Sequence, residues 1–145
     1  MDKEEKRSSI KYFTDCLIEL LIINGFAIQK YEAYTSNSVY IKVDYGVCGT
    51  VRISDHDSHK DNLRYLYNVN VCSTKKQKQT KVVGIVRRKY YSGSMLRKLM
   101  SDIKKNRDKK IKRFSINGYD KMIGKSISAN KNNRGYWQKA ELIWK

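Results

Sequence analysis

The sequence of 145 residues contains no proline, only three cysteines and two histidines, and few acidic residues. Because no proline marks a linker and the length suits one domain, we expect residues 1–145 to form a single domain. The longest uninterrupted apolar run, Leu20 to Ile23, is four residues long. A membrane-spanning helix needs about 20 apolar residues, so a transmembrane helix is excluded. No membrane-surface partner is expected either, because the basic helix predicted from Met95 has Leu, Met and Ile but no aromatic residue on its apolar side, and the sheet needs that side for packing.

The few cysteines also limit the class of protein. Cys16, Cys48 and Cys72 form no C-x-x-C pair and are odd in number, so we expect reduced thiols that pack as small core residues. The first residues, MDKEEKRSS, mix acids with bases and lack the apolar core of a signal peptide. These features predict a cytoplasmic protein.

Acidic residues are scarce relative to basic ones: 14 Asp and Glu stand against 31 Lys and Arg, which gives a net charge of +17. Residues 1–72 carry a net charge of −1, residues 73–113 carry +14, and residues 114–145 carry +4. Charge concentrated in one segment points to contact with an anionic partner such as nucleic acid. The sequence therefore predicts a near-neutral scaffold (1–72), a basic loop, strand and helix (73–113), and a C-terminal extension (114–145).

The spacing of apolar residues predicts the secondary structure. A helical repeat near the N-terminus is formed by Ile10, Phe13, Leu17, Leu20 and Leu21, and Gly25 follows where a helix cap would lie. Alternating apolar and polar residues predict strands over about residues 39–44, 50–54 and 63–71, and further strands are expected over about residues 27–34 and 81–91. The connections are too short for parallel crossovers, so the strands should pair antiparallel.

A second helix is expected from Met95, with Leu99, Met100 and Ile103 in its buried stripe and many basic residues on its other faces. Residues 118–127 are expected to form a short helix, and residues 136–144 a last strand or short helix. The predicted fold class is α+β: an N-terminal helix, an antiparallel sheet of about four to five strands, a basic second helix and a short C-terminal extension.

The basic stretch of residues 75–113 is the strongest candidate for a functional surface. Its cations would contact phosphates, and its two adjacent tyrosines would stack on bases or fix the orientation of the ligand. The alternative is a solvated helix face beside a lysine-rich loop. The candidate binding residues are Lys75, Lys76, Lys78, Lys81, Arg87, Arg88, Lys89, Tyr90, Tyr91, Arg97, Lys98, Lys104, Lys105 and Arg107.

A second cluster, Asp55, His56, Asp57 and His59, contains both histidines of the protein. Asp and His side chains can bind a divalent cation, so this cluster suggests a metal-dependent nuclease as an alternative function. The same run is also typical of a turn, where Asp and Ser form local hydrogen bonds, and no spaced metal motif accompanies it. The turn interpretation is favoured, and neither a catalytic residue nor a cofactor is predicted.

Two resemblances extend this interpretation. The helix–sheet–helix order resembles double-stranded-RNA-binding domains, which run α-β-β-β-α, although their Lys-Lys-x-Ala-Lys helix start is absent from the segment SGSMLRKLM. Residues 36–71, with the pieces Ser38-Val39-Tyr40-Ile41 and Arg52-Ile53-Ser54-Asp55-His56, resemble a segment of small bacteriophage and prophage proteins. That resemblance implies a phage setting, in which proteins often act on host nucleic acid or on host defence complexes.

The sequence thus predicts a non-enzymatic protein, encoded by a phage or mobile element, that binds DNA or RNA in the host cytoplasm with weak sequence preference. An inhibitor of the anti-CRISPR type, which binds a host nucleoprotein defence complex, is the first alternative. The metal-dependent nuclease is the second.

Overall fold

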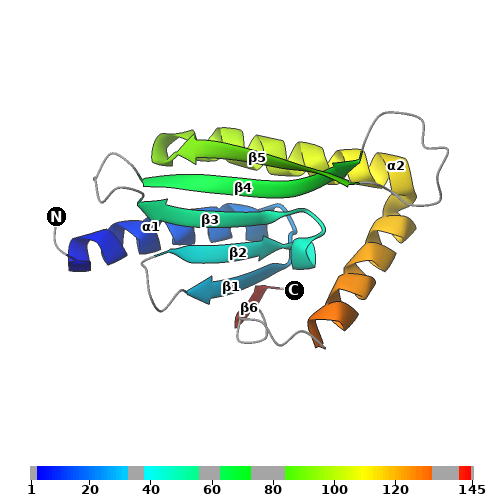
Figure 1. The fold of residues 1–145 in the computed structure, drawn as a ribbon, viewed down its shortest axis with the longest axis horizontal. Coiled ribbons are helices and arrows are strands. Elements are labelled where there is room, and N and C mark those ends of the chain that lie inside the picture. Colours follow the sequence, from blue (N-terminus) through cyan, green and yellow to red (C-terminus); the bar gives the residue numbers. More distant parts are fainter. Residues whose placement is uncertain (1–2, 33–37, 56–62, 73–83, 132–140, 145) are drawn as a thin grey trace.

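The computed structural model describes residues 3–32, 38–55, 63–72, 84–131 and 141–144. Two helices and six strands make up most of this chain, which confirms the α+β class (Figure 1). In chain order the elements are α1 (Lys3–Ile23), β1 (Ile28–Glu32), β2 (Val39–Val43), the 3₁₀ turn η1 (Asp44–Gly46), β3 (Thr50–Asp55), β4 (Leu63–Cys72), β5 (Gly84–Ser92), the 3₁₀ turn η4 (Gly93–Met95), α2 (Leu96–Lys131) and β6 (Glu141–Trp144).

The strands form one sheet in the order β5-β4-β3-β2-β1-β6, and every neighbouring pair is antiparallel. The five strands predicted for residues 27–91 are confirmed, and within the C-terminal extension, where a last strand or short helix was expected, β6 forms a further strand beside β1. Five strands separate α1 from α2, whereas a double-stranded-RNA-binding domain has three. The topological resemblance therefore does not extend to the number of strands.

Both helices pack against the same side of the sheet, as Figure 1 shows. The predicted apolar stripe of α1 is confirmed, with Leu17 and Leu21 buried, and α2 buries Leu99 and Ile103 in the same core. The strand residues that alternate toward the helices, such as Ile41, complete this core. The other side of the sheet has no helix packed on it within the described part of the chain, and we call it the open face.

The long helix α2 is broken at Ser115, whose backbone angles (φ 68°, ψ 168°) are not helical. Ser115 Oγ accepts a hydrogen bond from Gly118 N at 3.2 Å, an N-cap contact that begins a second helical arm. The short helix predicted for residues 118–127 is this second arm, and it continues to Lys131. The break lets the chain turn away from the sheet edge toward β6 (Figure 1).

The second arm is anchored to the connection between β2 and β3. Tyr119 Oη donates a hydrogen bond of 2.5 Å to Asp44 Oδ2, and Asp44 Oδ1 accepts one of 2.8 Å from Ala27 N. Lys110 is buried, and its Nζ donates to the Val47 carbonyl of the same connection.

Burial, followed by the nearby carboxylate of Asp44, raises the pKa of the Cys48 thiol to about 11. Cys48 is thus a neutral core residue, as predicted, and is not an activated nucleophile.

Candidate nucleic-acid interface

The predicted basic surface is divided by the alternation of side chains along β5. Tyr65, Tyr67 and Val69 of β4 are buried under the helices. Their antiparallel partners are Tyr91, Lys89 and Arg87, so these three side chains project toward the helix side. Arg88 and Tyr90 lie between them in the chain and therefore project onto the open face. Residues adjacent in sequence thus belong to two different surfaces.

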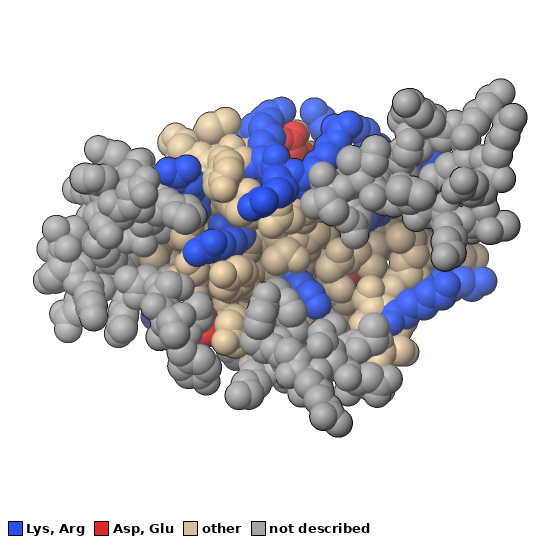
Figure 2. Space-filling view, in the orientation of Figure 1, with Lys and Arg blue, Asp and Glu red and all other residues tan. Residues whose placement is uncertain are grey.

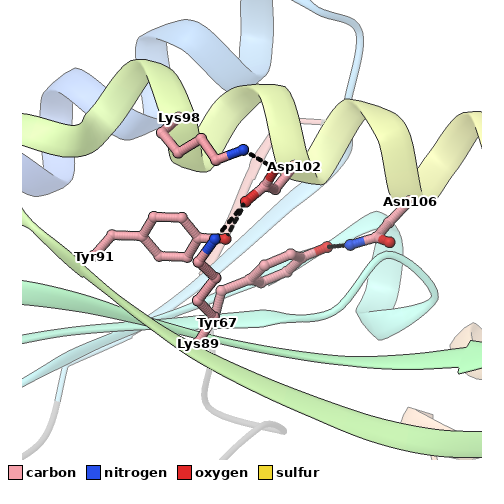
Figure 3. Close-up of polar contacts among 6 residues, drawn as sticks. All are labelled: Tyr67, Lys89, Tyr91, Lys98, Asp102 and Asn106. Carbon is pink, nitrogen blue, oxygen red and sulfur yellow. Dashed lines mark hydrogen bonds and ion pairs between the residues drawn. The ribbon is translucent and has the colours of Figure 1, made fainter.

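Tyr91 is not available for stacking on a base, because it is only 2% exposed. Its hydroxyl donates a hydrogen bond of 2.5 Å to Asp102 Oδ2, and Lys89 Nζ lies 3.6 Å from the same oxygen. Lys98 Nζ lies 3.3 Å from the other carboxylate oxygen, so Asp102 joins β5 to α2 (Figure 3). The predicted binding role of Tyr91 is wrong: its ring and hydroxyl hold α2 on the sheet.

The same cluster reduces the charge that Lys89 and Lys98 offer to a ligand. Burial alone would raise the pKa of Asp102, but the hydrogen bonds from Tyr91 and Lys98 and the charges of both lysines outweigh it and lower the pKa. The carboxylate is therefore ionised at neutral pH, and it partly neutralises the two cations beside it.

Arg107 also has a structural role where a phosphate contact was predicted. Its Nη1 donates a hydrogen bond of 2.8 Å to the carbonyl of Asn24, just after α1. Its guanidinium carbon lies 4.0 Å from the centroid of the Phe26 ring, within range of a cation–π contact. Arg107 thus ties α2 to the end of α1, and the prediction that it contacts phosphates is not supported.

Besides Lys98, which pairs with Asp102, three predicted cations of α2 are exposed to solvent: Arg97, Lys104 and Lys105. Because the buried stripe of α2 packs on the helix side of the sheet, these side chains project away from the sheet. We call Arg97, Lys104 and Lys105 the helix group. It lies on a different side of the molecule from Arg88 and Tyr90.

Some predicted residues lie outside the described part of the chain. These are the loop lysines Lys75, Lys76, Lys78 and Lys81, and, from the alternative nuclease cluster, His56, Asp57 and His59. Only the backbone of Asp55 is described, at the end of β3. Among the described residues, no group of three or more His, Cys, Asp or Glu side chains is placed to hold a metal ion.

The open face contains a row of five side chains, of which only Tyr90 was predicted from the sequence. Cross-strand pairing places Tyr31 of β1 opposite Tyr40, Tyr40 opposite Arg52, Arg52 opposite Leu66, and Leu66 opposite Tyr90. We call these five residues the central row. Directly paired residues on one face lie about 5 Å apart, so the row is continuous across five strands.

The rings and guanidinium groups of this face contact one another. The Tyr31 and Tyr40 ring centroids are 6.3 Å apart, and the Arg52 guanidinium carbon lies 5.7 Å from the Tyr40 centroid. Arg52 is held in place by two hydrogen bonds to Ser38 Oγ, at 3.1 and 3.2 Å. At the β5 end of the row, the Arg64 guanidinium carbon lies 5.4 Å from the centroid of Tyr90, which is 50% exposed. The row therefore combines aromatic surface with fixed positive charge.

Cations lie on both sides of the central row. The neighbouring row on one side is formed by Gln29, Lys42, Thr50, Asn68 and Arg88, and it contributes Lys42 and Arg88. The neighbouring row on the other side, formed by Ser54, Arg64 and Ser92, contributes Arg64. Burial lowers the pKa of Lys42, the direction expected where an ammonium group is partly removed from water. Among the described side chains that alternate onto the open face from β1 to β5, four are cations and none is a carboxylate. The cations are Lys42, Arg52, Arg64 and Arg88. The other side chains of this set are Gln29, Tyr31, Tyr40, Thr50, Ser54, Leu66, Asn68, Tyr90 and Ser92.

Figure 2 shows the molecule from this side, with Lys and Arg side chains gathered over the sheet. Several cations on one face attract anions, because the fields of like charges add. Tyrosine rings beside arginines add flat π surfaces to that charge.

Comparison of the chain with protein-family models, curated proteins and solved structures found no match. None of the helices in the described ranges is both long enough and apolar enough to span a membrane.

Proposed function

We propose that this protein is a non-enzymatic nucleic-acid-binding protein and that the open face of its sheet is the main binding surface. The observation that carries the proposal is the set of Lys42, Arg52, Arg64 and Arg88 on one sheet face with no carboxylate among the described side chains there. The helix group is a second, separate cationic surface. A ligand bound to the open face would reach the helix group only if it extended beyond the sheet.

Binding is tested by fluorescence anisotropy with labelled single-stranded and duplex oligonucleotides in a salt series. Each phosphate contact contributes a slope of about −0.7 for single strands and −0.9 for duplex in a plot of log K against log salt. Four contacts therefore predict that affinity falls about 50-fold for single strands, and about 150-fold for duplex, between about 50 and 200 mM salt. Absence of binding to either form at about 50 mM salt would refute the function.

Two double variants that remove equal charge distinguish the surfaces. Arg64→Gln with Arg88→Gln removes two cations of the open face, and Lys104→Gln with Lys105→Gln removes two cations of α2. The open-face pair should flatten the salt slope by about 1.4 or more, whereas the α2 pair should change it less. A larger effect of the α2 pair would place the binding surface on the helix instead.

Purification from cells tests the inhibitor alternative that follows from the resemblance to phage proteins. Under the proposal, the material that co-purifies is nucleic acid and is lost on nuclease treatment. A protein complex that stays bound after that treatment would instead favour an inhibitor of a host nucleoprotein complex.

A further inference from the structure

We infer that the ligand of the open face is a single-stranded nucleic acid whose bases stack on the tyrosines of the central row. This inference rests on the proposed function and specifies its substrate class. It is carried by the juxtaposition of Tyr31, Tyr40 and Tyr90 with Arg52 and Arg64 on one side of the sheet.

The exposed tyrosine rings favour a single strand over a duplex as the ligand. The bases of a duplex are already stacked on one another and present only their edges in the grooves. Unpaired bases expose their flat faces, and base–aromatic stacking contributes about 1–3 kcal/mol per base. A surface that bound duplex through its phosphates would need the cations but would gain nothing from tyrosine rings.

The dimensions of the central row suit an extended strand. Neighbouring strands lie about 4.8 Å apart, so the four intervals from β1 to β5 separate Tyr31 from Tyr90 by about 19 Å. The pair Tyr31 and Tyr40 lies at one end, Tyr90 lies at the other, and the buried Leu66 lies between Arg52 and Tyr90. A short strand that crosses the β-strands can therefore stack at both ends of the row.

The flanking cations provide for the phosphates of such a strand. Lys42 and Arg88 lie along one side of the central row, and Arg64 lies along the other, so a backbone on either side of the bases meets positive charge. Arg52, held by Ser38, lies within the row itself. Since these contacts are to phosphates and ring faces, they carry little sequence information.

The test compares Tyr90→Leu with Tyr90→Phe, using 12-nucleotide DNA and RNA strands, their duplexes, and the same DNA strand with abasic sites in place of its central bases. Tyr90 is half-exposed, so both variants should fold, and thermal melts verify this. Tyr12→Leu is the matched control, because Tyr12 is an exposed tyrosine of α1, and α1 packs on the opposite side of the sheet.

We expect the wild-type protein to bind the intact strand more tightly than the duplex or the abasic strand. Tyr90→Leu should weaken binding of the intact strand about 5- to 150-fold, equivalent to the stacking of one base, while Tyr90→Phe and Tyr12→Leu stay close to wild type. The leucine variant should also lose part of the discrimination against the abasic strand, because Tyr31 and Tyr40 remain at the other end of the row. Tighter binding of a single strand than of its own duplex supports the inference, whether that strand is DNA or RNA.

Failure of this inference differs from failure of the proposed function. If intact, abasic and duplex ligands bind equally and Tyr90→Leu has no effect, binding is through phosphates alone: the stacking inference is overturned and the proposed function stands. If no ligand binds at about 50 mM salt, both are overturned.

Discussion

Replacement of Tyr119 by phenylalanine should destabilise the protein by removing one buried hydrogen bond. The Tyr119 hydroxyl donates to the Asp44 carboxylate at 2.5 Å, and both side chains are buried. Burial, together with the neighbouring Cys48 and Asp44, raises the pKa of Tyr119 above its usual value, so the hydroxyl remains a donor at neutral pH. In the variant, Asp44 keeps the hydrogen bond from Ala27 N and loses the one from residue 119 of α2.

The magnitude follows from the kind of bond. A hydrogen bond to a charged group contributes about 1.5–3 kcal/mol to stability. With an unfolding entropy of about 2.1 cal/mol/K per residue, a chain of 145 residues should lose about 5–10 °C in Tm. Urea and thermal unfolding followed by far-UV circular dichroism measure both quantities.

Two controls make this result interpretable. Tyr12→Phe removes an exposed hydroxyl and should change stability by less than about 0.5 kcal/mol. In a double-mutant cycle with Asp44→Asn, the combined loss should be smaller than the sum of the single losses, because each change removes the hydrogen bond between the phenol and a charged carboxylate. If Tyr119→Phe is as stable as Tyr12→Phe, the reasoning that this bond fastens the second arm of α2 to the β2–β3 connection is refuted.

Two further changes test the fold and the link between β5 and α2. Gly49→Ala should cost roughly 3 kcal/mol or more in urea unfolding, because φ is +98° and a new Cβ would lie 2.5 Å from the Asn68 carbonyl oxygen. Gly25→Ala, at φ +78° with no atom within 4 Å, should cost only about 1–2 kcal/mol, and equal losses would contradict the steric argument. Asp102→Asn should be less stable than wild type at neutral pH. Because the pKa of Asp102 is lowered in the folded state, its stabilisation is present above about pH 4 and is lost as the pH falls through that lowered value. The stability difference should therefore shrink on acidification, and a difference that is the same at pH 7 and pH 3 would count against the proposed ion-pair cluster.

Part of the candidate site could be predicted from the sequence. The concentration of charge in residues 73–113 is a property of composition, and it led to Arg88 and Tyr90, which lie on the open face. Tyr91 was wrongly predicted to stack on bases. Alternation along a strand divides its side chains between two faces, but in an edge strand such as β5 it does not show which face is buried. That choice is made by β4 and α2, which bury Tyr91 against Asp102.

The central row could not be predicted from residues near in sequence. Tyr31 and Tyr90 lie on strands far apart in the chain and share a face only because four successive pairings are in register. A shift of one residue in any of these pairings would move a whole strand's side chains to the other face. The sequence indicates only that these side chains alternate with buried ones along each strand. It does not specify which residue of the neighbouring strand lies opposite each of them.

The sequence by itself determined the elements: the apolar repeat of α1, the alternation of β1 to β5, the basic α2 and the cap at Gly25. These follow from local periodicity and backbone preference, which act over a few residues. Only the tertiary structure decided which cations share a surface, because strand register and helix packing assign each side chain to a face. It likewise decided that Arg107, Lys110 and Tyr119 serve the fold, since their partners come from distant parts of the chain.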